Sequence, residues 1–322
     1  MSQARAFFHS VLFAAALALA PAHAADAPKY EVDAAWPKPL PNDWIMGQAA
    51  GVAVDGEDHV WVVQRPKTLT DDEKAAALDP PRTKCCRPAP PVLEFDQSGR
   101  LLRSWGGPGQ GYDWPSNEHG VYVDAQGFVW LAGNGDKDGQ ILKFTKDGKF
   151  VLQIGKPGDQ TNSADTSRLG RPANMTVDAA ANELYVADGY YNHRIIVFDA
   201  TTGAFKRMWG AYGAAPTDEK TAAYDPSAAP SKQFGNPVHC VRIARDGLVY
   251  VCDRVNDRIQ AFRKDGTFVK EMFVEKATRA NGSVWDLELF PDENETWLVN
   301  ADGANNEVRL IRRDSGEVVG VF

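Results

Sequence analysis

Apolar and polar positions alternate in short runs between Gly235 and Phe262, and the pattern predicts three strands. Apolar residues stand at every second position on both sides of Asp246-Gly247, as at Val241 and Val251. This is the period of half-buried strands, and an Asp-Gly pair between two such runs is a strong hairpin signal. The stretch is therefore predicted to fold as a hairpin followed by a turn and a third strand.

The same pattern occurs five times along the chain. Each copy is predicted as four strands joined by turns, and four strands per unit at a spacing of about 40 to 70 residues is typical of a β-propeller blade. The alternative is a sandwich whose hairpins are alike by coincidence, and the agreement of inner and outer turns among the copies argues against it. The predicted fold is an all-β propeller domain over 47–322, with blades at about 47–106, 118–155, 172–210, 236–274 and 283–322.

Three segments fall outside the repeats. Residues 25–46 are predicted as an N-terminal extension, in which Tyr30 to Trp36 could add an edge strand. Residues 66–90 interrupt the first copy, and we expect a short helix there from Thr70 to Leu78, capped by Thr70. Residues 211–234 separate the third and fourth copies. Long loops at one end of a propeller make walls around its axial mouth, and both insertions are predicted at that end.

The first residues have the pattern of a cleavable signal peptide. Arg5 precedes a ten-residue apolar run from Val11 to Ala20, and Ala22-His23-Ala24 provides an A-x-A cleavage site. The run is too short to span a bilayer, although an uncleaved anchor is the alternative. We therefore expect residues 1–24 to be removed and the protein to be periplasmic or secreted, without a membrane span. A net charge of −8 argues against nucleic acid as a partner.

An oxidising compartment permits disulfides among the four cysteines, which allow three connectivities. Cys240 and Cys252 are predicted on neighbouring strands of one hairpin, so these two could meet. Adjacent cysteines such as Cys85 and Cys86 rarely bond each other.

The copies differ at a few equivalent positions, and these differences indicate where function lies. One of these positions begins the innermost strand, and histidine occupies it in alternate copies. In a six-bladed ring these histidines would point at the central channel, where three neutral imidazoles make a zinc site with one open position. The alternative is that each histidine caps its own strand. The five residues at this position are Ala50, His119, Ala173, His239 and Trp285.

A second such position ends the second strand, where Arg65 and Arg254 stand in the first and fourth copies. The turn that follows is one residue longer in the third copy, which favours an inward aromatic side chain at Tyr190. Strand direction places all three residues on the same face as the histidines. For the arginines, the alternative is ion pairing with Asp188 or Asp253.

Two further arginines recur at the same turn. Arg194 and Arg258 follow Asp188 and Asp253 at nearly constant spacing in the third and fourth copies. They are predicted to be structural and to pair with these aspartates.

At these residues the chain resembles a known family. VADGYYNHRIIVF (186–198) and VHCVRIARDGLVYVCDRVNDRIQAF (238–262) resemble the six-bladed NHL-repeat propeller of peptidyl-α-hydroxyglycine α-amidating lyase. EHGVYVDAQGFVWL (118–131) is similar to the zinc segment of the second blade in that family. The resemblance covers roughly residues 47–275, and its NHL repeats are common, whereas the His, Arg and Tyr positions are more specific.

The resemblance implies a zinc-dependent lyase site. His119 and His239 would be zinc ligands, and Tyr190, Arg65 and Arg254 would be catalytic. Zinc would acidify a carbinolamide hydroxyl, and Tyr190 would accept its proton at a pKa lowered by zinc and arginine. An arginine would bind the substrate carboxylate.

The resemblance also implies a structural calcium held by backbone carbonyls that correspond to Val52 and Val121. The family places its third zinc histidine and its calcium carboxylate in a sixth blade. This sequence contains five copies, so we expect a six-bladed architecture with the last blade missing, and a closed ring of five blades is the alternative. A family cysteine is replaced by Tyr191.

Three functional hypotheses follow. The first is a secreted or periplasmic propeller with a zinc-centred axial site that cleaves a carbinolamide, an α-hydroxyglycine-like substrate. The second is a non-catalytic NHL-repeat propeller that binds a peptide or protein at the same face. The third is a calcium-dependent lactonase-like propeller, for which Asn134 and Asn300 are the loosely fitting ligands. All place a small molecule or peptide at the axial mouth.

Overall fold

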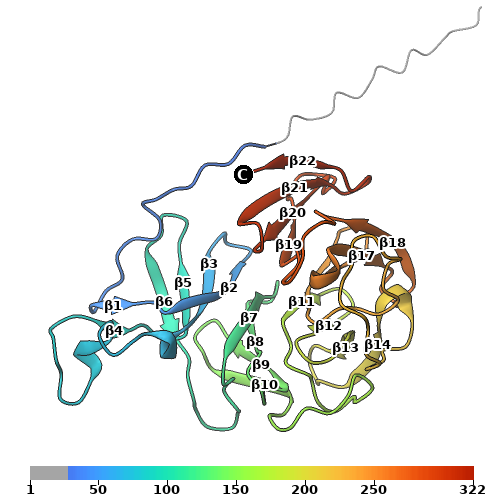
Figure 1. The fold of residues 1–322 in the computed structure, drawn as a ribbon. Helices are drawn as coiled ribbons and strands as arrows, with labels where there is room; N and C mark the ends of the chain where they lie inside the picture. The colour runs from blue at the N-terminus through green and yellow to red at the C-terminus, as the bar shows by residue number, and fades with distance from the viewer. Residues whose placement is uncertain (1–27) are drawn as a thin grey trace, which may run out of the picture.

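The computed structural model describes residues 28–322, which form five four-stranded antiparallel sheets arranged around an axis (Figure 1). The predicted all-β propeller with five blades is confirmed, whereas the expected signal peptide over residues 1–24 lies outside the described residues. The strands, from the axis outward in each blade, are β2 (Gln48–Val54), β3 (Val60–Arg65), β5 (Val92–Phe95) and β6 (Leu101–Trp105); β7 (Glu118–Val123), β8 (Phe128–Gly133), β9 (Gln140–Thr145) and β10 (Phe150–Gly155); β11 (Asn174–Asp178), β12 (Glu183–Asp188), β13 (Arg194–Asp199) and β14 (Phe205–Trp209); β15 (Val238–Ile243), β16 (Val249–Asp253), β17 (Arg258–Phe262) and β18 (Phe268–Phe273); β19 (Asp286–Leu289), β20 (Trp297–Asp302), β21 (Glu307–Arg312) and β22 (Val318–Val321).

The hairpin of the fourth blade shows how the sequence forms each sheet. Val241 pairs with Val251 across β15 and β16, and the turn between these strands has Gly247 at φ 84°. Only glycine adopts that conformation readily, which is why the Asp-Gly pair fixes the turn. Alternate side chains then point to opposite faces of the sheet and pack against the neighbouring blades on each side.

Apolar layers between the blades form the core. The layer between the third and fourth blades is built around Tyr185, Val197, Val241 and Phe262, all fully buried. Neighbouring inner strands contact each other from β2 through β7, β11 and β15 to β19. Within residues 28–322, blade five does not pack on blade one to a comparable extent (Figure 1). The sixth blade therefore stays a prediction.

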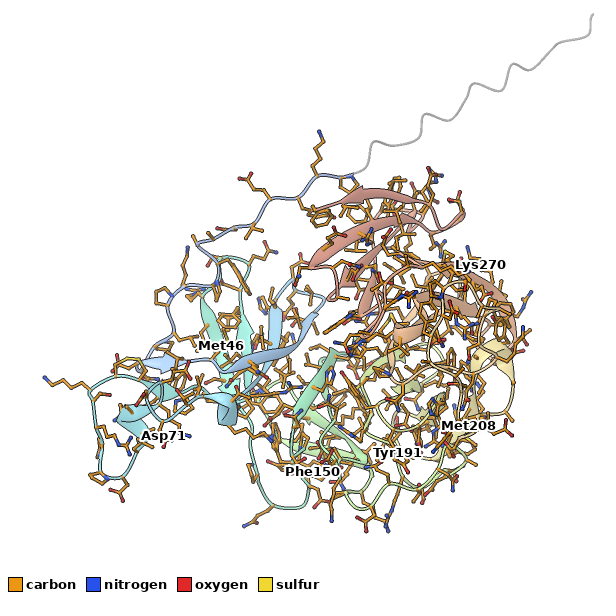
Figure 2. All side chains as sticks on the ribbon, viewed as in Figure 1. Met46, Asp71, Phe150, Tyr191, Met208 and Lys270 are labelled. Carbon is orange, nitrogen blue, oxygen red and sulfur yellow. A yellow bond between two sulfur atoms is a disulfide. The ribbon has the colours of Figure 1, made fainter. Side chains whose placement is uncertain are left out.

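The N-terminal extension does not add the expected edge strand over Tyr30 to Trp36. A turn at Asp33, whose carbonyl accepts the Trp36 N–H at 3.2 Å, breaks the extended run, and three prolines follow. The segment instead covers the face of blade one that points away from blade two, and Figure 2 marks Met46 beside this blade. Its side chains on that face are Trp36, Leu40, Trp44 and Met46.

Two further contacts tie the extension to the propeller. β1 (Trp44–Ile45) pairs in parallel with β4 (Arg87–Pro88), which lies within the first insertion. Tyr30 stacks on Phe322 beyond β22, with ring centroids 4.7 Å apart. The extension therefore reaches from blade one to blade five.

The first insertion is irregular where a helix was expected. Only Ala75–Ala77 forms a 3-10 turn within Thr70 to Leu78, although Thr70 and Glu73 make the expected capping contacts. Pro80 and Pro81 follow closely, and a residue before proline is disfavoured in helical conformation. Asp71 near its tip lies at the periphery of the molecule (Figure 2), so this insertion extends outward from blade one.

Both cysteine pairs are disulfide-bonded. Cys240 and Cys252 join β15 to β16, as the sequence allowed. Cys85 and Cys86 are also bonded to each other, so the expectation that neighbouring cysteines stay apart is wrong here. Among residues 28–322, no helix has the length and apolar character needed to cross a membrane.

The recurrent Asp–Arg pairs at the blade turns are confirmed as structural. Arg194 Nε lies 2.9 Å from Asp188, and Arg258 Nε lies 2.7 Å from Asp253. All four side chains are fully buried. Each aspartate also accepts a backbone N–H from the loop that precedes its blade, at Gly170 or Gly235. The pairs therefore fasten each blade to the loop that enters it.

A glycine on β7 sets the distance between blades two and three. A Cβ at Gly120 would lie 2.4 Å from the Ala173 carbonyl oxygen. We expect Gly120→Ala to lower the free energy of unfolding by about 1–3 kcal/mol, because two backbones must separate. Urea denaturation measures this, and Gly56→Ala is the matched control, since nothing lies within 4 Å of its added methyl group. Equal midpoints for the two variants would contradict the close-approach argument.

Candidate functional site

The two histidines singled out by the repeat comparison meet at the axis. His119 lies near the start of β7 and His239 near the start of β15, and both are buried. The Tyr190 hydroxyl lies between them, 2.7 Å from His119 Nε2 and 3.0 Å from His239 Nε2. The ring centroids of the two histidines are 5.1 Å apart. Blades two, three and four each contribute one side chain to this cluster.

The longer turn of blade three brings Tyr190 inward. Gly189 allows the approach, because a Cβ there would lie 2.1 Å from the Val238 carbonyl oxygen. The Tyr190 N–H then donates to the Arg171 carbonyl at 3.2 Å. The Tyr191 side chain is instead 42% exposed. The turn therefore directs Tyr190, and not its neighbour, to the histidines.

Arg254 reaches the cluster from the end of β16. Its Nη1 donates to the Tyr190 hydroxyl at 3.4 Å and its Nε donates to the Asn281 carbonyl at 2.8 Å. The guanidinium carbon lies 3.9 Å from the ring centroid of Trp285. Within the described residues it has no carboxylate within ion-pairing distance, because Asp253 is paired with Arg258.

Arg65 stands on the other side of the site. Its Nε donates to the Glu118 carbonyl at 2.7 Å and its Nη1 donates to Gln48 at 3.3 Å. It too lacks an ion pair in the part of the chain that the structure describes, so the alternative of pairing with Asp188 or Asp253 is wrong for both arginines. The site therefore contains two guanidinium groups that form no ion pair with any of residues 28–322.

Hydrogen bonding fixes the tautomer of His239. Its Nδ1 lies against the Trp285 carbonyl oxygen, which can only accept, so Nδ1 carries the proton. Nε2 then presents its lone pair, and the Tyr190 hydroxyl donates to it. A neutral imidazole whose Nδ1 proton is held by a carbonyl is the form that binds metals, and a metal at Nε2 would take the place of the Tyr190 hydroxyl proton.

Burial and neighbouring cations keep both histidines neutral. Burial lowers the pKa of His119 well below its usual range, with smaller effects from His239 and Arg65. Burial, followed by Arg254, lowers the pKa of His239 to about 3. For Tyr190, burial raises the pKa and outweighs Arg254. The expectation of a lowered tyrosine pKa is therefore not met by arginine alone, and an additional cation would have to supply the difference.

The pKa of His239 predicts a loss of stability in acid. An unfolded histidine takes up a proton as pH falls through about 6.5, whereas folded His239 stays neutral until about 3. Stability present above pH 6.5 is therefore lost as pH falls. Between pH 7 and 4 we expect wild type to lose roughly 2–3 kcal/mol more of its unfolding free energy than His239→Gln. Urea unfolding across this range tests it, and parallel curves would contradict it.

The donor set at the axis fits zinc in part. Two neutral imidazoles converge on one point, which is half of a tetrahedral set. The other described histidines lie elsewhere, since His59 contacts Glu94 and His193 contacts the Phe234 carbonyl. Residues 28–322 thus bring two histidines to this point.

A small cavity of about 40 Å³ adjoins the histidines. Val52 and Val121, whose carbonyls the resemblance assigns to calcium, line it. Asp286 also lines it, and the repeat comparison did not single this residue out. Its carboxylate is engaged by Arg242 at 3.1 Å and by Asn174 at 3.3 Å. An arginine thus already neutralises the one carboxylate that faces this cavity among the described residues.

Two other groups of side chains are candidate metal ligands. Asp55, Glu57 and His59 cluster at the opposite end of β3 from Arg65. Lys146 Nζ lies 2.9 Å from Asp55 and 2.6 Å from Glu57, so an ammonium group already balances these carboxylates. For the lactonase-like hypothesis, Asn300 is fully buried and its Nδ2 donates to the Ser283 carbonyl at 3.2 Å, whereas its Oδ1 has no hydrogen-bond partner among the described residues.

Comparison with known proteins agrees with this architecture. The NHL repeat model matches residues 169–198, the segment that contains Tyr190. NHL repeat-containing protein 3 of Mus musculus is 27% identical over 248 residues, covering 74% of this chain and 58% of that protein. Peptidyl-glycine alpha-amidating monooxygenase B of Xenopus laevis is 26% identical over 234 residues, covering 70% and 24%. A probable peptidyl-alpha-hydroxyglycine alpha-amidating lyase of Caenorhabditis elegans is 28% identical over 200 residues, covering 59% and 49%.

Solved structures support the fold alone. A streptogramin B lyase aligns with TM-score 0.50 and 16% identity, covering 86% of this chain and 69% of that chain. A Bacteroides caccae protein of unknown function aligns with TM-score 0.51 and 10% identity, covering 85% and 81%.

The chain is a five-bladed β-propeller that contains an NHL repeat. It is related to the peptidylglycine alpha-amidating monooxygenases and to NHL repeat-containing protein 3, of which it spans less than two thirds.

Proposed function

We propose that the chain is a metal-dependent lyase that cleaves a carbinolamide with an adjacent carboxylate, an N-acyl-α-hydroxyglycine. The observation that carries the proposal is the Tyr190 hydroxyl between two neutral histidines and beside Arg254, which has no carboxylate partner among the described residues. The relationship to a probable amidating lyase supports the same reaction class.

The chain's residues divide the work of this reaction. In the proposed reaction the carbinol O–H loses its proton, the C–O bond becomes a carbonyl and the C–N bond breaks. The amide nitrogen takes up a proton, so the products are an amide and glyoxylate. Tyr190 is the group placed to accept the hydroxyl proton and return it to the nitrogen. Arg254 and Arg65 would bind the carboxylate. His119 and His239 would hold zinc, which supplies Lewis acidity at the hydroxyl.

The compartment and partners are proposed on separate grounds. Both cysteine pairs are bonded, which suits a secreted or periplasmic protein. The partner is a small molecule or a peptide that ends in α-hydroxyglycine, bound at the axial mouth. A structural calcium at Val52 and Val121 remains part of the proposal, with Arg242 as its competitor for Asp286.

The test is zinc content together with glyoxylate release from N-benzoyl-α-hydroxyglycine. Zinc-loaded wild type is expected to release glyoxylate, and the His119→Ala plus His239→Ala variant to lose both metal and activity. His59→Ala, at the other end of the propeller, is the matched control. Stoichiometric zinc that survives loss of both histidines would overturn the proposal, as would no turnover by zinc-loaded wild type.

A second function is favoured by Arg65 and Arg254, which form no ion pair within residues 28–322 and so attract an anion whether or not a reaction follows. A non-catalytic NHL-repeat propeller would bind a peptide carboxylate at this face. It predicts binding without metal and no change in affinity on Tyr190→Phe.

A further inference from the structure

Trp285 connects three parts of the site. It precedes β19 in blade five, at the position that histidine occupies in blades two and four. Its carbonyl accepts the Nδ1 proton of His239, and its indole lies under the Arg254 guanidinium. Its Nε1–H donates to the Gly282 carbonyl at 2.8 Å, which fixes the ring in its own plane.

Backbone also lies against the indole. A Cβ at Gly303 would lie 2.4 Å from the indole, so no side chain fits at that position without moving the ring. The indole is therefore in close contact with both Gly303 and Arg254. It is half-buried, and it supports one face of the Arg254 guanidinium group.

These contacts leave one nitrogen of Arg254 without a hydrogen bond to any described residue. The side chain is 8% exposed and two of its nitrogens have partners, Nε with Asn281 and Nη1 with Tyr190. Nη2 makes no hydrogen bond to any described residue. A guanidinium donates in its own plane, and the indole covers one of its faces. Nη2 is therefore available to a planar anion that approaches in the plane of the guanidinium. A buried cation without a counter-ion favours such a ligand.

We propose that Trp285 is the positioning residue of a carboxylate subsite at Arg254, and that its indole makes the site select a carboxylate over the corresponding amide. The proposal rests on the proposed function, since it names the group that the subsite takes from the substrate. Stacking holds the guanidinium flat and removes rotamer freedom before the ligand arrives. Trp285 touches no reacting atom in this scheme.

Calorimetric titration with N-benzoylglycine and N-benzoylglycinamide tests the selection. Wild type is expected to bind the carboxylate more tightly, and Trp285→Ala to lose about tenfold in that affinity with little change for the amide. Trp285→Phe, which retains an aromatic face, is expected to recover most of it. Zinc affinity should not change, because the His239 partner is the backbone carbonyl of residue 285. Trp297→Phe, a tryptophan of the same blade packed near Arg312, is the control.

A double-mutant cycle separates positioning from general packing. If the indole acts through the cation, Trp285→Ala has no further effect on carboxylate affinity in an Arg254→Gln background. An equal loss for both probes, or a loss that persists without Arg254, would overturn the proposal. Lack of glyoxylate release with intact carboxylate selection would contradict the lyase function and leave the subsite standing. With turnover, Trp285→Ala is expected to raise KM and leave kcat unchanged.

Discussion

Tyr190→Phe is expected to lower kcat for N-benzoyl-α-hydroxyglycine by about 10²–10⁴-fold, the usual contribution of a positioned acid or base. The substitution removes only the hydroxyl, which lies within 3.0 Å of both histidines. The ring still packs against His119 at a centroid distance of 5.0 Å, so the fold should be unaffected. Binding of N-benzoylglycine should stay within about threefold, because Arg254 keeps its indole and its Asn281 contact.

Steady-state kinetics on the zinc-loaded protein measures this effect. Tyr191→Phe is the matched control, since it makes the same change one residue away on an exposed side chain. If Tyr190→Phe retains full kcat, the Tyr190 hydroxyl is not the group that transfers the proton. Another side chain must then act as the base.

Arg258→Met should produce the largest loss of stability, about 3–5 kcal/mol in the free energy of unfolding. The guanidinium holds Asp253 at 2.7 Å, the Tyr212 hydroxyl at 2.8 Å and the Gln233 carbonyl at 3.1 Å. Both members of the ion pair are fully buried. Removing the cation leaves a carboxylate without water and without its principal partner, and this accounts for the size of the effect.

Chemical denaturation of a small set of variants isolates the cause. Adding Asp253→Asn to Arg258→Met should restore part of the lost stability, because the orphaned charge is removed. Arg312→Met breaks a pair with Asp314 on the exposed rim and should cost less than about 1 kcal/mol. If the double variant is no more stable than Arg258→Met, the loss comes from packing and not from charge.

Repetition made the fold and the structural pairs predictable. The blade pattern repeats because each sheet meets the same two neighbours, so period-2 runs and Asp-Gly turns recur with it. The pairing of Arg194 and Arg258 with their aspartates followed from the same comparison. The structure of the non-repeated parts could not be predicted from this comparison. Contacts such as Trp36 against Phe95, at 5.5 Å, depend on a surface that occurs once.

The candidate site was predictable where it departs from the repeat. His119, His239 and Tyr190 stand at positions where other copies have other residues, and the structure brings both histidines within hydrogen-bonding distance of the Tyr190 hydroxyl. Trp285 stands at the same position in its copy, but its role depends on a carbonyl and a ring face that meet residues of another blade. Such contacts between blades have no signature in spacing along the chain.

The way the ends of the blade array are covered has a consequence for the order in which the molecule opens. Within residues 28–322, the N-terminal extension covers the face of blade one that points away from blade two, whereas it contacts blade five chiefly through Tyr30 on Phe322. Hydrogen exchange and limited proteolysis should therefore begin at blade five. Trp285 belongs to that blade and contacts both His239 and Arg254. Local unfolding of blade five would therefore disrupt the axial site before the propeller unfolds as a whole.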